Sequence, residues 1–143
     1  MGALAARIAT WFGRGRASRR DPLGPRGERL AMKHLRAKGY RRLGANVRTG
    51  AGEIDLIALA PDRRTIVFVE VKAKRVSDSS EHRAPPPEAS VHAKKRAKLR
   101  LLAGQIAREK GWADRPLRID VVAVEAAEHG APSIRHYENA VTG

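Results

Sequence analysis

Three residues of the chain, Asp55, Glu70 and Lys72, have types and a spacing that could do chemistry together. Asp55 lies in the segment EIDLIALA, and Glu70 and Lys72 lie in FVEVKAK, where apolar and charged residues alternate. Alternation with a period of two predicts strands, so Phe68, Glu70 and Lys72 should share one face. The turn-forming residues PDRR separate the segments and predict a hairpin, which would bring Asp55 nearly opposite Glu70.

Two carboxylates and a lysine on adjacent strands suit the hydrolysis of phosphodiesters. Carboxylate oxygens are the ligands that Mg²⁺ prefers, and a divalent ion polarises a phosphate and lowers the pKa of a bound water. A lysine ammonium can position that water or neutralise charge that develops on the phosphate. The carbonyl of Val71 is a further candidate ligand. Glu70 and Lys72 could equally be the solvent-exposed face of an amphipathic strand, each paired across the sheet.

The composition narrows the class of protein. The 143 residues suit one domain, and 29 Lys and Arg against 15 Asp and Glu give a net charge of +14. A domain this basic is expected to meet a polyanion, with nucleic acid the first candidate and a ribosome or an acidic membrane the second. The absence of cysteine excludes disulfides, thiolate nucleophiles and cysteine zinc sites. Aromatic residues make up only 4%, which argues against reading single-stranded RNA by base stacking.

The sequence also bears on location. No apolar run approaches the roughly 18 residues of a membrane span, and the N-terminal segment lacks the pattern of a signal peptide. We therefore expect a cytoplasmic protein without a membrane partner. Residues 1–23 are rich in arginine, glycine and serine and predict a disordered basic arm ahead of a domain over residues 24–143.

Within the domain the pattern predicts the order αβββαβ, followed by a fifth strand. A helix over residues 24–39 precedes an antiparallel meander at 40–48, 53–60 and 65–74. A proline-rich loop at 76–89 leads to a basic helix that ends near residue 110, then to a strand at 117–124 and a last edge strand at 133–140. Strict alternation puts Ile54, Leu56 and Ala58 on one face of the second strand and Asp55 on the other.

Several blocks carry a resemblance to known proteins. An aspartate followed after 14 residues by Glu-Val-Lys, behind an N-terminal helix, resembles the PD-(D/E)xK nuclease superfamily. The blocks GERLAMKHLRAKGY, NVR, GEIDLIA, FVEVKAK, RIDVVAV and HYENAV resemble the small bacterial YraN-like family over residues 24 to about 141. That family is similar to archaeal Holliday-junction resolvases, so the resemblance implies a restriction-endonuclease-like α/β fold with a mixed sheet of four or five strands between helices.

The resemblance also implies roles. Asp55 and Glu70 would hold Mg²⁺, with Mn²⁺ as an alternative, and Lys72 would be the catalytic lysine. Glu28 matches an acid that completes the metal site in some relatives. Glu53 would contact the metal ligands rather than the ion itself. Residues expected to contact phosphate are Asn46, Arg48, and, on the basic helix, Lys94, Lys95 and Lys98.

The sequence thus predicts a metal-dependent DNA endonuclease that contacts the phosphate backbone, with branched or structured DNA as candidate substrates. One alternative is a nucleic-acid-binding or docking module that keeps the nuclease fold without turnover. A second alternative is a protein that associates with RNA or ribosomes by recognising their shape rather than by stacking on bases. Junction resolvases act as dimers, and this leaves a homodimer open, although no apolar stripe identifies a dimer face.

Overall fold

The structure, a computed structural model, describes residues 23–76, 89–127 and 129–141. Its sheet has the order β1-β2-β3-β4-β5, antiparallel throughout except for the parallel pair β3–β4. Most of the predicted basic arm and the proline-rich loop lie outside the described residues. The elements in chain order are α2 (Leu23–Ala37), β1 (Arg41–Thr49), β2 (Gly52–Leu59), β3 (Ile66–Val76), α3 (Ala89–Glu109), β4 (Leu117–Ala127) and β5 (Ser133–Tyr137).

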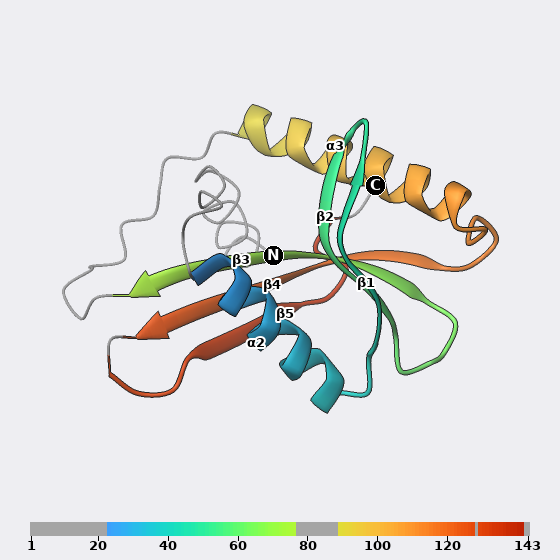
Figure 1. The fold of residues 1–143 in the computed structure, drawn as a ribbon. Helices are drawn as coiled ribbons and strands as arrows, with labels where there is room; N and C mark the ends of the chain where they lie inside the picture. The colour runs from blue at the N-terminus through green and yellow to red at the C-terminus, as the bar shows by residue number, and fades with distance from the viewer. Residues whose placement is uncertain (1–22, 77–88, 128, 142–143) are drawn as a thin grey trace.

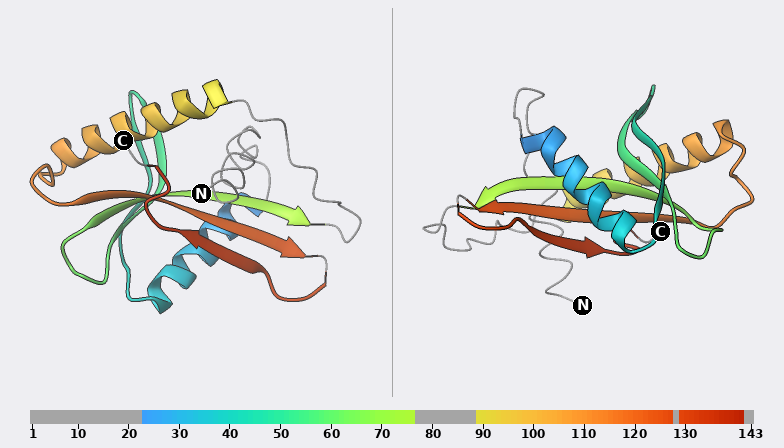
Figure 2. Two further views of the ribbon diagram at one scale, coloured as in Figure 1. Left: turned by 180° about the vertical axis from the view of Figure 1, so that it is seen from behind. Right: turned by 60° about the horizontal axis from the view of Figure 1, so that its bottom comes forward.

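The two helices cover opposite faces of the sheet (Figures 1 and 2). Two separate hydrophobic clusters result, one with α2 and one with α3. Leu35 of α2 packs with Val69 and Val122, whereas Ile106 of α3 packs with Phe68 and Val121. Neighbouring residues of a strand therefore enter different cores, as the alternation of side chains requires. The predicted α/β fold with a mixed sheet flanked by helices is confirmed, and the fifth strand is present.

The helix ends follow their local sequence. Gly39 and Gly111 lie two residues beyond the ends of α2 and α3 and have φ of 95° and 74°, a left-handed conformation that glycine adopts without a steric penalty. No helix among the described residues is long and apolar enough to cross a lipid bilayer.

The hairpin of β1 and β2 departs from the predicted alternation. Ile54 belongs to the α3 cluster, whereas Leu56, which was expected on the same face, belongs to the α2 cluster. A two-stranded ribbon twists more strongly than the centre of a sheet, so the tip of this hairpin turns toward α3 (Figure 1). The hydroxyl of Thr49 at this tip donates to Oε1 of Gln105 on α3 at 3.3 Å.

Candidate active site

The pairing of β2 with β3 brings Asp55 and Glu70 together. Their antiparallel register runs from Leu59 opposite Ile66 to Leu56 opposite Val69. One further step along each strand sets Asp55 across from Glu70. There, the amide of Val71 donates to Oδ2 of Asp55 at 2.8 Å, so a side chain of β2 takes the place of the next backbone bond. The convergence predicted from the hairpin is therefore present.

Lys72 joins these carboxylates from the same face of β3. Its Nζ lies 3.1 Å from Oε1 of Glu70, and the two side chains are only 15% and 17% exposed. Residues two apart in a strand point to one side, which explains the contact. An ion pair shielded from water to this degree is a fixed feature of the site rather than a chance surface contact.

The pKa of Asp55 reflects the burial and the charges at the site. Its burial and the nearby charge of Glu70 raise its pKa to about 7, and Glu28 adds to this effect. The amide of Val71 and the ammonium of Lys72 act in the opposite direction without cancelling it. Removal of Asp55 from water and the nearby carboxylates thus disfavour its charged form, and a bound cation would relieve this penalty.

Gly27 explains how Glu28 reaches the site from α2. A Cβ at Gly27 would lie 2.7 Å from Cβ of Ala73, so only glycine allows this part of the helix to approach β3 so closely. Glu28 follows Gly27 in α2 and is near enough to Asp55 for its charge to raise the pKa of that carboxyl. Of the predicted ligands, the structure brings Glu28, Asp55 and Glu70 into one electrostatic neighbourhood.

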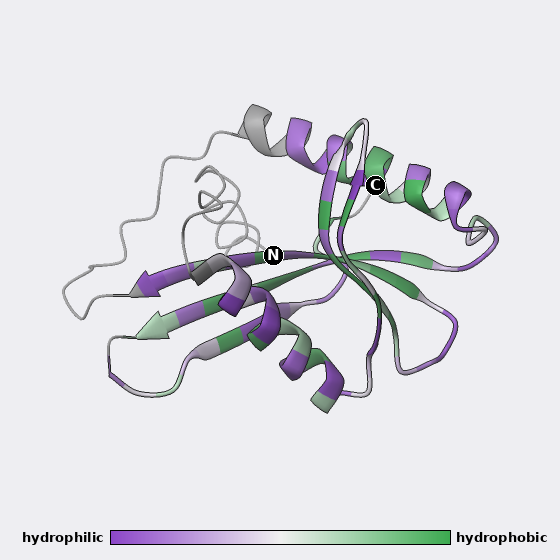
Figure 3. Ribbon diagram, viewed as in Figure 1, coloured by the Kyte–Doolittle hydropathy of each residue, from purple (hydrophilic) through white to green (hydrophobic). Residues whose placement is uncertain are grey.

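On α3, the structure selects Lys95 among the three predicted lysines. Burial and the charge of Lys72 lower the pKa of Lys95, and Glu70 acts against this, so Lys95 faces the site. Lys94 and Lys98 are exposed, in the hydrophilic first half of the helix (Figure 3). The sequence contained a signal for this choice, because residues 95, 99, 102 and 106 form one helical stripe whose last three members are buried.

The predicted residues of the β1–β2 hairpin have a different setting. Nε of Arg48 lies 2.8 Å from Oε2 of Glu53, directly across the hairpin, with the Arg48 side chain 59% exposed. Asn46 is exposed and has a left-handed backbone with φ of 50°. The roles of Asn46, Arg48 and Glu53 at the site stay predictions.

The donor set fits a magnesium ion. Within the described residues, no three acidic, histidine or cysteine side chains are gathered as a ready ligand group. Mg²⁺ does not need one, because it commonly binds one or two carboxylates and keeps water or phosphate oxygens as its other ligands. Asp55 and Glu70 supply two hard oxygen donors. The carbonyl of Val71 is expected to point to the same side as its amide, toward Asp55.

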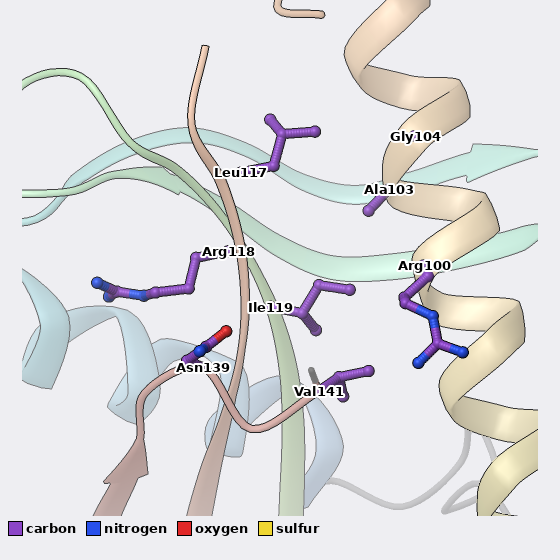
Figure 4. Close-up of a pocket in the computed structure, with 8 residues that line it drawn as sticks. All are labelled: Arg100, Ala103, Gly104, Leu117, Arg118, Ile119, Asn139 and Val141. Carbon is purple, nitrogen blue, oxygen red and sulfur yellow. The ribbon is translucent and has the colours of Figure 1, made fainter. Parts of the chain in front are cut away.

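A pocket of about 370 Å³ lies elsewhere, between the second half of α3, the start of β4 and the C-terminal segment (Figure 4). Arg100 and Asn139 are at its rim, and Ala103, Ile119 and Val141 are among its apolar residues. It contains none of the carboxylates described above, so the candidate site is an open cluster on the strands rather than this pocket.

A second buried carboxylate, Asp120 on β4, has the opposite environment. Arg118 donates to both of its oxygens at 2.9 Å, from Nε to Oδ1 and from Nη2 to Oδ2. Nε2 of His136 lies 2.7 Å from Oδ2, and the amide of Asn139 donates to Oδ1 at 2.9 Å. Burial alone would raise the pKa of Asp120, but these hydrogen bonds outweigh it and lower the pKa.

Tyr40 extends this network and ties it to the start of β1. Its hydroxyl accepts from Nη2 of Arg118 at 2.6 Å and donates to Oε1 of Glu138 at 2.9 Å. The position of Asp120 inside the apolar segment RIDVVAV indicates that it has a partner in the fold. It gave no sign of Tyr40, which lies 78 positions before Arg118 in the chain.

These elements define an α/β protein in which a carboxylate–lysine cluster lies on two adjacent strands, with acidic and basic help from a helix on each face. Comparison with known proteins gives the family. The model of the Uncharacterised protein family UPF0102 matches residues 27–124, and the chain belongs to this family, the YraN-like family that the sequence resembles. That prediction is confirmed.

Relatives from several bacteria match most of the chain. A UPF0102 protein of Alkaliphilus oremlandii is 43% identical, with 82% of this chain and 96% of that one covered. Those of Pseudomonas aeruginosa and Geotalea uraniireducens are 41% and 37% identical over 82% of this chain and 88% and 87% of theirs. Among solved structures, SfsA of Pyrococcus furiosus in complex with Ca²⁺ matches with a TM-score of 0.38 and 16% identity, covering 81% of this chain and 62% of that chain.

Proposed function

We propose that this protein is a metal-dependent nuclease that hydrolyses phosphodiester bonds of DNA, with Mg²⁺ as its ion and Mn²⁺ as a substitute. The observation that carries the proposal is the convergence of Asp55, Glu70 and Lys72 across the β2–β3 pair, with a 2.8 Å bond orienting Asp55 and a 3.1 Å ion pair holding Lys72. The element order and the position of the set on the second and third strands agree with the nuclease superfamily that the sequence resembles.

The residues divide the work as follows. Asp55 and Glu70 bind the ion, with Glu28 and the carbonyl of Val71 as further donors to it or to its waters. When bound, the ion polarises the phosphate and lowers the pKa of a water. Lys72 is held beside Glu70 and neutralises charge that develops on the phosphate in the transition state.

The basic half of α3 supplies contacts to the DNA backbone. Lys94 and Lys98 are exposed for phosphate contacts, whereas Lys95 reaches toward the reacting group. These contacts read the backbone and not the bases, which suits recognition of DNA by shape.

We further propose that the protein acts in the cytoplasm. Branched DNA is a candidate substrate, and a homodimer is a candidate assembly. A DNA-binding module without turnover is the second candidate, because the exposed basic half of α3 could bind DNA without any chemistry at the carboxylates.

The test is cleavage of labelled linear duplex, single-stranded and four-way-junction DNA in Mg²⁺ or Mn²⁺, beside EDTA controls. We expect cleavage with either ion and none in EDTA. Asp55→Ala and Lys72→Ala should each reduce the rate by at least about 100-fold while DNA binding remains. The matched control is Lys74→Ala, because Lys74 follows on the same face of β3 and pairs with Glu125 at 3.6 Å.

Lys74→Ala should retain cleavage within a few-fold, and circular dichroism should show the same fold for all variants. If the wild-type protein binds every DNA but cuts none with either ion, the nuclease is rejected and the binding module is supported. If cleavage occurs but survives both site substitutions, the residues assigned here are wrong.

A further inference from the structure

Five arginines gather at the end of the sheet where the β2–β3 turn lies. Strand pairing sets the first residues of β1 beside the last residues of β2, directly before this turn. On the other side, the amide of Ile66 donates to the carbonyl of Pro116 at 2.9 Å, which holds the loop before β4 against the start of β3. The turn-end cluster, as we call it, consists of Arg41, Arg42, Arg63, Arg64 and Arg115, all exposed.

The turn and the loop between α3 and β4 lie at the same end of the molecule in every view (Figures 1 and 2), and the turn is strongly hydrophilic (Figure 3). None of the five guanidinium groups forms an ion pair with another described residue. The acids in these segments are Asp62 and Asp114, so positive charge prevails.

Asp62 is committed to the turn itself. Its carboxylate accepts hydrogen bonds from the amides of Arg64 and Thr65 at 2.8 and 2.9 Å and from the Thr65 hydroxyl at 2.6 Å. These bonds, the hydroxyl first, lower the pKa of Asp62 to about 2. These hydrogen bonds fix the conformation of the turn. The Asp62 carboxylate is therefore bound to the backbone of the segment that contains Arg63 and Arg64.

Arg63, in the turn itself, has an unusual backbone conformation. It has a left-handed backbone with φ of 60°, where glycine or asparagine would be more stable than arginine. The amide of Arg63 donates to the carbonyl of Ala60 at 2.9 Å, which closes the turn and keeps this conformation. Strained residues that the surrounding structure holds in place are typical of functional positions. The turn thus holds Arg63 in a strained conformation with its side chain exposed.

We infer that the turn-end cluster is a second contact surface for the phosphate backbone of a nucleic acid. Guanidinium groups bind phosphate in a bidentate geometry, and the cluster is built from arginine alone. It also lacks the broad apolar face by which a helix inserts into a membrane surface. The inference goes beyond cleavage, since it concerns binding at residues that the carboxylate site does not include.

The position of the cluster sets the expected footprint. Ile66 precedes Glu70 by four residues, and a strand rises about 3.3 Å per residue, so the turn begins about 13 Å from the carboxylates. With extended arginine side chains, the cluster reaches phosphates about 20 Å from the reacting one, or roughly half a turn of duplex. Bound DNA would therefore follow the β2–β3 hairpin from the site to its turn.

The experiment measures binding of a fluorescein-labelled 24-base-pair duplex by anisotropy in EDTA, so that cleavage plays no part. Arg63→Gln combined with Arg64→Gln should weaken binding about tenfold. It should also reduce the slope of log K against log salt by about 2, because each phosphate contact contributes about 0.9. The matched control, Arg29→Gln combined with Lys33→Gln, removes the same charge from the exposed surface of α2 and should leave the slope within about 0.5 of wild type.

Arg63→Gly guards against a change that only unfolds the turn. It should raise the midpoint of thermal unfolding by about 2 °C, because the left-handed strain is relieved, yet still weaken binding. The inference is overturned if the double variant binds like its control, or if the wild type binds poly-glutamate or anionic vesicles through these arginines and DNA without them. Absence of cleavage with cluster-dependent binding would reject the proposed nuclease and leave this inference standing.

Discussion

Two aspartates on neighbouring parts of the sheet are treated in opposite ways. Asp120 has both oxygens occupied by arginine, histidine and backbone donors, and its pKa is lowered. Asp55 receives the amide of Val71 and lies near two other acids, and its pKa is raised to about 7. The difference separates a carboxylate that stabilises the fold from one whose charge is left for something else to neutralise.

The largest expected effect concerns the satisfied carboxylate. Asp120→Ala should lower the free energy of unfolding by about 3–5 kcal/mol, because it leaves Arg118 and His136 without their buried partner. Urea denaturation followed by circular dichroism measures this. A loss below about 1 kcal/mol would mean that the network contributes little and that the contrast between the two aspartates is not one of stability.

Asp55 should show the reverse in the absence of divalent ions. Its folded pKa of about 7 lies above the ordinary value of 3.8, so its contribution to stability is complete below pH 4 and declines as the pH rises to about 7. Asp55→Asn should remove this decline and raise the free energy of unfolding by about 2 kcal/mol at pH 8 in EDTA. Urea titrations from pH 4 to 8 measure it.

Asp120 sharpens the comparison in the same titration. Its pKa is lowered from 3.8, so its contribution is present above pH 4 and is lost as the pH falls further. The wild-type protein should therefore lose stability as the pH rises toward 7, because of Asp55, and again when the titration is extended below pH 4, because of Asp120. Equal pH profiles for the wild type and Asp55→Asn would show that ionisation of Asp55 does not lower the free energy of unfolding.

A smaller effect tests how α2 brings Glu28 to the site. Alanine is usually more stable than glycine in a helix, yet Gly27→Ala should lower the free energy of unfolding by about 1–2 kcal/mol because its Cβ meets Ala73 at 2.7 Å. Gly24→Ala is the matched control, since no atom lies within 4 Å of a Cβ there. Adding Ala73→Gly to Gly27→Ala should restore stability and activity, and failure to do so would locate the strain elsewhere.

The smallest effect is expected at the hairpin tip. Arg48 is 59% exposed and Glu53 is 14% exposed, and an ion pair with one partner in solvent contributes about 0.5–1 kcal/mol, so Glu53→Gln should lower the unfolding midpoint by only a few degrees. Cleavage should stay within about threefold of wild type if Glu53 acts only through Arg48. A loss comparable to that of Asp55→Ala would instead place Glu53 among the residues that hold the ion.

Much of the site could be predicted from local pattern. The PDRR turn and the alternation of FVEVKAK fix which residues face each other, so Asp55, Glu70 and Lys72 followed from the sequence. The turn and the alternation do not predict the twist of the β1–β2 hairpin, which moves Ile54 to the α3 cluster. The choice of Lys95 over Lys94 depends on the rotation of α3, which the buried stripe sets and the lysine run alone does not.

The network of Asp120 was beyond such reasoning. It joins Tyr40 at the start of β1, Arg118 on β4 and His136 on β5, and these residues meet only through the order of the sheet. A polar residue inside an apolar strand indicates that a partner exists but does not say which one. The same applies to Gly27, whose contact with Ala73 depends on how α2 packs.

The most direct test of the account is the response of thermal unfolding to Mg²⁺. At tenfold excess over its Kd, a single bound ion stabilises the folded state by about 1.4 kcal/mol, so the wild-type midpoint should rise by several degrees. Asp55→Asn should show no rise, whereas the control Glu125→Gln, which alters an acid paired with Lys74, should behave like wild type. A wild-type midpoint that Mg²⁺ leaves unchanged, or an equal rise in Asp55→Asn, would contradict the assignment of Asp55 and Glu70 as the metal site.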